Sequence, residues 1–386
     1  MESLLINRKA LCSAFDFAKN AIPQRPIILA DGNILLTWDG HEKLMLSACD
    51  GCMGAKSSII PISSNSVETF TVGVDPKRFG KAISKDTTEN ICLSKKGQDL
   101  VISNPQDSAE NYVTLLGANM RRASILTHWM PDESDLINNV KIKSDFIAET
   151  LSFLDSFTSS GSSGDKRHDI LTLENKMAHT TNGCGLRGIV VSKEFNFSEG
   201  VCFSKRFIKP LSSILKQIEC DSITMKSSKR IISFYTEDQS RIVVLPTEQK
   251  IPPEINLMYL QMGDGLEEVN VKEWSTSLDR MTTSNYNTIT ALTGLDIDIS
   301  KGKIKFTLEG SKASCELPFS KNINYALSKV VDIMSFYRFI KVFAKSKNAL
   351  IQFGDDSSRF VRVVDKREFG EIKSAFIAAI AYARKV

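Results

Sequence analysis

Short apolar runs that lead into amphipathic stretches recur along the whole chain. Alternating or β-branched runs typical of strands follow each amphipathic stretch. The unit then repeats inside each third of the sequence, so a module of strand, helix and further strands is predicted six times. Each third opens with a strand and helix of this kind, predicted at 4–6 and 8–21, at 140–142 and 144–157, and at 269–271 and 273–284.

The second helix of each third carries a basic stripe. Side chains three, four, seven or eleven positions apart share one face of a helix, so each stripe predicts a positively charged face. Three such helices at intervals of roughly 130 residues indicate three copies of one domain turned toward something anionic. The stripes are Lys77, Lys81 and Lys85; Lys205, Lys209 and Lys216 on a helix predicted over 204–218; and Arg338, Lys341 and Lys345 on a helix predicted over 332–345.

The length agrees with three domains. A chain of 386 residues with 42% hydrophobic content can bury more than one core. Polar, turn-rich stretches at 127–135 and 247–254 separate the thirds, which predicts domains at 1–135, 136–250 and 251–386. The Gly/Ser-rich stretch 158–166 is expected to be a surface loop inside the second domain.

The charge balance limits the kind of nucleic-acid binding to expect. The chain has 49 basic and 45 acidic residues and a net charge of +4, so affinity for DNA must come from where the charges lie. The eight cysteines are scattered and the first residues lack a secretion-signal pattern, which predicts a cytoplasmic protein. The longest apolar run, 375–381, is too short to span a bilayer, so no membrane association is expected.

Several motifs could suggest a cofactor or metal site. Cys49 and Cys52 form a CxxC pair, but a structural zinc site needs four ligands and the chain has no second CxxC, so a turn between strands is expected. The glycines of 183–188 match GxGxxG, yet strand-like residues follow where a dinucleotide site requires a helix. No cofactor and no metal are therefore predicted.

An enzyme is also disfavoured. His179 and Cys184 near His168 could be drawn as a Cys–His pair, but no third group is indicated. The acidic pairs Asp355–Asp356 and Glu267–Glu268 are expected in turns, not in a metal-dependent nuclease site. The sequence predicts no catalytic residues.

Four segments carry a family resemblance. The segment 20–36 contains an arginine–proline pair, Arg25–Pro26, before a strand, and 180–186 reads Thr-Thr-Asn-Gly-Cys-Gly-Leu. Ile251-Pro-Pro-Glu and the apolar segment 376–386 complete the set. Together these segments resemble the bacterial-type DNA sliding clamps, the beta subunit family of DNA polymerase III, in a divergent or phage-borne form. Asn182 and Gly185 stand where the family has aspartate and arginine.

The resemblance implies an α+β fold of three tandem clamp domains, each a duplicated strand–helix–strands unit. In a ring of two identical subunits the helices would lie inside and the sheets outside. Such a ring would encircle duplex DNA and tether the replicative polymerase, with the clamp loader and other partners binding a cleft through a short apolar motif. The DNA-contacting residues would be Arg25, Lys77, Lys81, Lys205, Lys209, Arg338 and Lys341, and the cleft residues Thr181, Gly183, Leu186, Pro252, Leu257, Ile380 and Tyr382.

Two alternatives stay open. The resemblance places the subunit contact at Tyr112, Thr114, Thr282 and Thr283, which are more polar than an apolar interface needs. The chain could therefore be a clamp-fold DNA-binding protein that does not form a closed ring. It could also be a clamp-fold protein that binds replication proteins without carrying DNA.

Overall fold

The computed structural model describes most of the chain. The described residues are 3–22, 32–65, 67–85, 88–106, 110–116, 129–158, 170–181, 186–248, 267–284, 293–300, 302–310, 312–319, 327–344, 346, 349–353, 360–381 and 383–384. The chain divides into two compact units. The first comprises Met1–Ala148 and Lys209–Glu248, and the second comprises Glu149–Ile208 and Gln249–Val386. The three-domain boundaries at 135 and 250 stay a prediction.

The first unit is built on one 13-stranded antiparallel sheet. Its strands alternate buried and partly exposed side chains, as in β2 and β3, which is the pattern of a sheet with one face packed on a core. In sheet order the strands are β10 (Asn138–Lys143), β15 (Ser222–Ser227), β16 (Ile231–Tyr235), β17 (Arg241–Pro246), β4 (Gly54–Ile59), β3 (Leu44–Cys49), β2 (Ile34–Trp38), β6 (Phe70–Val74), β9 (Glu110–Leu116), β8 (Asp99–Ser103), β7 (Asn90–Lys96), β1 (Ser3–Asn7) and β5 (Ser63–Asn65).

The second unit contains an eight-stranded and a five-stranded sheet, both antiparallel. The eight-stranded sheet runs β14 (Val201–Ser204), β11 (Ile170–Glu174), β12 (Met177–Thr181), β13 (Leu186–Ser192), β25 (Ile372–Ala381), β24 (Phe360–Phe369), β23 (Ala349–Phe353) and β18 (Glu267–Glu268). The five-stranded sheet runs β21 (Ser314–Pro318), β20 (Lys303–Leu308), β19 (Gly294–Ser300), β22 (Leu327–Asp332) and β26 (Ala383–Arg384).

The described residues form six α-helices, and each follows a strand, so the predicted strand-then-helix order is confirmed. Two 3₁₀ turns, η3 (Glu133–Asp135) and η5 (Lys205–Phe207), accompany them. The helices are α1 (Arg8–Lys19), α2 (Pro76–Lys85), α4 (Ser144–Asp155), α5 (Ile208–Leu215), α6 (Val271–Ser284) and α7 (Ile333–Val342). None of these helices is long and apolar enough to cross a membrane.

Two strand pairings join parts of the chain that lie far apart in sequence. In the first unit, β4 pairs with β17, with Ala55 opposite Val243. In the second unit, β13 pairs with β25 along its whole length, from Leu186 opposite Ile380 to Ser192 opposite Ser374. Each pairing crosses a predicted domain boundary, so the sheets are continuous where the sequence suggests a break. We refer to these two pairings as the β4–β17 seam and the β13–β25 seam.

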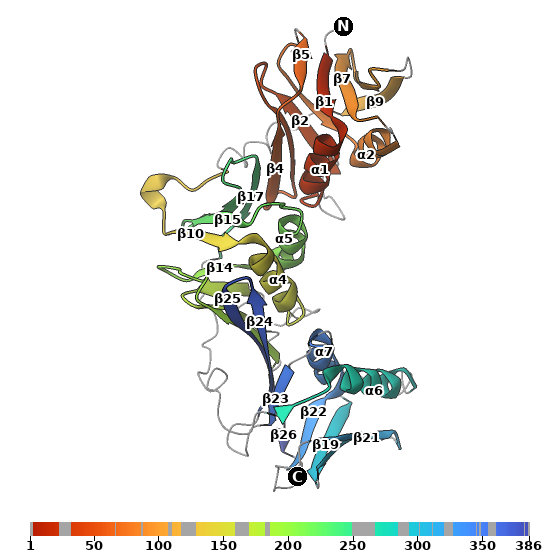
Figure 1. Cartoon of the computed structure of the whole chain (residues 1–386), viewed down its shortest axis with the longest axis vertical. Coiled ribbons are helices and arrows are strands. Elements are labelled where there is room, and N and C mark those ends of the chain that lie inside the picture. Colours follow the sequence, from red (N-terminus) through yellow and green to blue (C-terminus); the bar gives the residue numbers. More distant parts are fainter. Residues whose placement is uncertain are drawn as a thin grey trace. The chain divides into compact units, whose positions relative to one another are not determined.

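Close packing of aromatic rings against the backbone explains why glycine occupies two positions. The helices α1 and α2 lie side by side (Figure 1), and the rings of Phe15 and Phe79 have centroids 5.6 Å apart. A Cβ atom at Gly80 would lie 2.6 Å from the Phe15 ring. At Gly188 of β13, a Cβ atom would lie 2.4 Å from the ring of Phe157. Only glycine lets these aromatic rings approach the backbone this closely.

The structure corrects three expectations. No strand forms at 269–271, because α6 already begins at Val271 and the strand before it is β18. The helix predicted over 204–218 is a 3₁₀ turn followed by the shorter α5, because Pro210 has no N–H and favours a place in the first turn of a helix. Glu267–Glu268, expected in a turn, form the short strand β18, which pairs with β23. A surface loop is predicted at 158–166, and all of these residues except Thr158 lie outside the described part of the chain.

Candidate nucleic-acid interface

The first basic stripe lies on α2. Asp75 caps this helix by accepting a hydrogen bond from the backbone N–H of Arg78 at 2.8 Å, and Pro76 begins it. Phe79 and Ile83 are buried, which turns Lys77, Lys81 and Lys85 to the exposed side. Within the described part of the chain, none of these three lysines has an acidic partner. The stripe therefore presents three uncompensated positive charges.

The second stripe is interrupted. Lys205 lies in η5 and Lys216 lies beyond the end of α5, so only Lys209 occupies α5 itself, where it is exposed. The break follows from the 3₁₀ turn, because a tighter helix rotates its side chains by a different angle per residue. Arg206, exposed and stacked 4.4 Å from the centroid of the Phe207 ring, adds a cation that the four-residue spacing did not indicate.

In the third stripe, on α7, one of the cations is linked to an acidic residue through a tyrosine hydroxyl. Phe336, Phe339 and Ile340 are buried and Arg338 and Lys341 are exposed, as predicted. The Lys341 ammonium donates to the Tyr337 hydroxyl at 3.1 Å, and that hydroxyl donates to Asp279 of α6 at 2.6 Å. The hydrogen bond with Tyr337 raises the pKa of Lys341. Lys341 is thus held in place and stays cationic, while Arg338 has no acidic partner among the described residues.

Other exposed cations lie on helices that sequence spacing did not single out. Lys9 is in the first turn of α1, and Lys272 is in the first turn of α6. Lys9 has no second cation at helical spacing on α1, so no pattern could have identified it. Lys272 is followed by the exposed Arg280 eight positions later on α6, the offset that also separates Lys77 from Lys85, and this pair was not predicted from the sequence. Arg25, the loop arginine of the resemblance, lies outside the described residues.

Three of the seven predicted cleft residues come together at one end of the β13–β25 seam. Leu186 and Ile380 are cross-strand partners, and the Thr181 hydroxyl donates to the Leu186 carbonyl at 3.1 Å. Leu186 and Ile380 are only 3% and 2% exposed, so both side chains are buried in the core beneath the β13–β25 seam. Gly183, Pro252, Leu257 and Tyr382 lie outside the described residues.

The motifs that could have indicated an enzyme have structural roles in the described residues. Cys49 and Cys52 form no disulfide bond among the described residues and flank a turn between β3 and β4, where Asp50 accepts from the backbone N–H of Cys52 at 2.8 Å. Gly188 is followed by the rest of β13, not by the helix that a dinucleotide site needs. The buried His179 lies 3.3 Å from Glu174. No group of three metal-ligating side chains occurs among the described residues.

Comparison with known proteins identifies similar solved structures but no match at the level of sequence. No protein-family model matches the chain, and no curated protein matches it either. The structure is similar over its full length to the beta subunit of DNA polymerase III from Thermotoga maritima, with a TM-score of 0.79, 14% sequence identity and 100% of each chain covered.

Two further solved structures are similar to this chain over nearly its full length. The beta subunit of the Streptococcus pyogenes DNA polymerase matches with a TM-score of 0.77 and 15% identity, over 99% of this chain and 100% of that one. The Helicobacter pylori beta clamp, solved with a DNA ligase peptide, matches with a TM-score of 0.70 and 14% identity, over 99% of each chain. The chain therefore has the sliding-clamp fold, which confirms the predicted fold class.

Proposed function

We propose that this protein is a DNA polymerase processivity factor, a sliding clamp that encircles duplex DNA in the cytoplasm as a homodimeric ring. The observation that carries the proposal is the pairing of a full-length clamp fold with exposed cations on α2, α5 and α7. Long lysine and arginine side chains reach phosphates without reading bases, which suits a protein that must slide. The fold supports a role without catalysis, and the proposal includes no cofactor.

The proposed partners are the replicative polymerase and the clamp loader, which would bind through a short apolar motif. The relative from Helicobacter pylori was solved with a DNA ligase peptide, which supports peptide binding in this fold. We place the cleft at the Leu186–Ile380 end of the β13–β25 seam, with Thr181, Gly183, Pro252, Leu257 and Tyr382. An extended peptide would bind beside this buried pair, on the residues that surround it.

The test is charge reversal on the helices. Changing Lys205, Lys209, Arg338 and Lys341 together to glutamate should abolish retention on circular DNA, because repulsion replaces attraction at four phosphate contacts. The slope of log K against log salt should fall in magnitude by about three to four units. The matched control reverses Lys43, Lys95, Lys229 and Lys312, which are exposed and lie off these helices. Normal retention by the first variant would contradict the assignment.

The hydrogen bonding and burial of the predicted subunit-contact residues favour a second candidate function. Tyr112 donates a hydrogen bond to Glu110 of its own strand, and Thr282 is only 9% exposed. Thr282 therefore supplies little surface to an interface, and the hydroxyl of the exposed Tyr112 is already engaged within its own strand. We therefore keep a clamp-fold protein that does not close into a ring, binding DNA or replication proteins, as the alternative.

A further inference from the structure

The eight-stranded sheet carries a hollow of about 940 Å³ at the end of the β13–β25 seam away from Leu186 and Ile380. Residues of β13, β24, β25 and the β11–β12 turn line it. Six residue steps of strand separate the two ends, or about 20 Å. The hollow is therefore distinct from the proposed partner cleft, and a ligand could occupy it whether or not the protein binds DNA.

The floor of the hollow is apolar. In this floor Val191 of β13 lies opposite Ala375 of β25. Met177 of β12 lies opposite Val191 on the other side and extends the apolar row beyond the lining of the hollow. These three partly buried side chains pack against a fully buried cluster of Ile189, Val364 and Ile377. Because cross-strand partners point to the same face of a sheet, the floor is one continuous apolar row.

Four lysines surround this floor. Lys366 is the cross-strand partner of Ala375 and Lys373 lies two residues before Ala375, so both share the face of the apolar row. Lys193 lies in the turn that follows β13 and also lines the hollow. Lys176 comes from the β11–β12 turn. All four are exposed, and within the described part of the chain none of their ammonium groups has an ion-pair partner. Among the described residues, Glu368 is the one acidic residue that lines the hollow.

The position of Lys176 is fixed by its backbone. It adopts a φ of 63°, and its N–H donates to the carbonyl of Phe195 at 2.6 Å. Its own carbonyl accepts from the N–H of Ser192 at 3.0 Å. The two hydrogen bonds tie the turn to the end of β13, so this lysine is held beside the floor before any ligand arrives.

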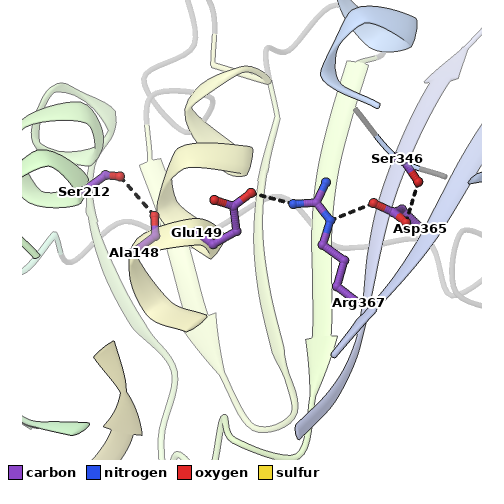
Figure 2. Close-up of polar contacts among 6 residues, drawn as sticks. All are labelled: Ala148, Glu149, Ser212, Ser346, Asp365 and Arg367. Atoms are coloured by element: carbon purple, nitrogen blue, oxygen red, sulfur yellow. Dashed lines mark hydrogen bonds and ion pairs between the residues drawn. The ribbon is translucent and has the colours of Figure 1, made fainter. Parts of the chain in front are cut away.

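The arginine that lines the hollow, Arg367, is already occupied. It donates to Glu149 at 2.6 Å and to Asp365 at 2.7 Å, and its guanidinium lies 4.3 Å from the centroid of the Phe376 ring. Asp365 in turn accepts from Ser346 at 2.7 Å (Figure 2). The planar fork that best recognises a phosphate is therefore engaged inside the protein.

We propose that this hollow docks an acidic, extended segment of a partner protein that places one apolar side chain on the Val191–Ala375 floor. The four lysines complement the negative charge of the segment, and the apolar row takes an anchor that a nucleic-acid backbone does not have. A phosphate ligand is disfavoured, because Arg367, whose planar guanidinium would best recognise it, is engaged by Glu149 and Asp365.

The test uses a fluorescein-labelled peptide of glutamates and aspartates around a central leucine, titrated with the full chain at low salt and followed by anisotropy. The double variant K193E/K373E should weaken binding at least tenfold, and V191T, which replaces a floor methyl with a hydroxyl, about threefold. The matched control K95E/K229E reverses two exposed lysines outside the hollow and should bind like the unmodified protein.

Ligand controls separate the possible occupants. The peptide with alanine in place of leucine, and the peptide with glutamine and asparagine in place of the acids, should each bind at least fivefold more weakly. Equal binding of the alanine peptide, together with displacement by a short DNA duplex, would mark a phosphate-binding surface and overturn the proposal. No detectable peptide binding, or binding unchanged in K193E/K373E with normal circular dichroism, would also overturn it.

Discussion

At the scale of single residues, a few side chains decide where helices and strands can approach. Gly188 has no Cβ, and the ring of Phe157 occupies the space where one would be. The sequence showed Gly188 only as the last glycine of a GxGxxG match, since the approach of Phe157 depends on folding. By contrast, Phe79 and Ile83 alternate with the lysines of α2 at helical spacing, so their burial could be predicted.

Replacing Gly188 with alanine should lower the free energy of unfolding by about 1–3 kcal/mol, because the new methyl group overpacks against Phe157. Urea denaturation measures the change. The matched control is Gly200→Ala, where the new Cβ would lie 3.7 Å from the nearest atom and the change should stay within about 0.5 kcal/mol. Equal stability of both variants would show that Phe157 moves away without cost.

At the scale of elements, the strand-then-helix order followed from local pattern, whereas the pairing of distant strands did not. In β20 (Lys303–Leu308) buried residues alternate with more exposed ones, and such alternation can be predicted from the sequence because it follows local hydrophobicity. The pairing of Leu186 with Ile380 joins residues of separate predicted domains, and no local signal specifies it. The contact of Asp279 with Tyr337 was missed for the same reason, as it joins two helices.

Strand β9 carries a pH-sensitive group. Hydrogen bonds from Lys96, at 2.7 Å, and from Tyr112 lower the pKa of Glu110 from its ordinary value of 4.5. A lowered folded-state pKa contributes stability above pH 4.5, and this contribution is lost as the pH falls through the folded-state pKa. Glu110→Gln should therefore lower the urea midpoint at neutral pH, with a difference from the unmodified protein that shrinks below pH 4.5.

The partner variant supplies the check on this pH dependence. Lys96→Met removes the same ion pair from the other side, so its difference from the unmodified protein should shrink over the same acidic range. Differences that persist unchanged in acid would contradict the role of Glu110. Because the pair is exposed, both differences should also decrease at high salt.

At the scale of the whole molecule, several described strands have an unpaired edge that can extend a sheet, and β9 and β21 are among them. The segment Glu110–Thr114 of β9 pairs with β8 alone among the described residues, and β21 pairs with β20 alone. Open edges of this kind add a strand from another chain. Such an edge would add main-chain hydrogen bonds to the proposed subunit contact, where the buried Thr282 contributes little surface.

Light scattering across a dilution series tests this association. A stable mass of twice 42.9 kDa is expected for the proposed two-subunit ring. A mass that stays at 42.9 kDa would leave the fold unaffected and favour the alternative without a closed ring. A mass that falls toward 42.9 kDa on dilution would indicate a weak interface, as the polar contact residues suggest.

The two seams also have a mechanical consequence. A load applied along paired strands is shared by all the hydrogen bonds of the pairing, so a longer pairing resists a greater force. The β13–β25 seam spans all of Leu186–Ser192, whereas the β4–β17 seam spans only Arg241–Val244. Of the two seams, we therefore expect the β4–β17 seam to separate at the lower force under tension along its strands.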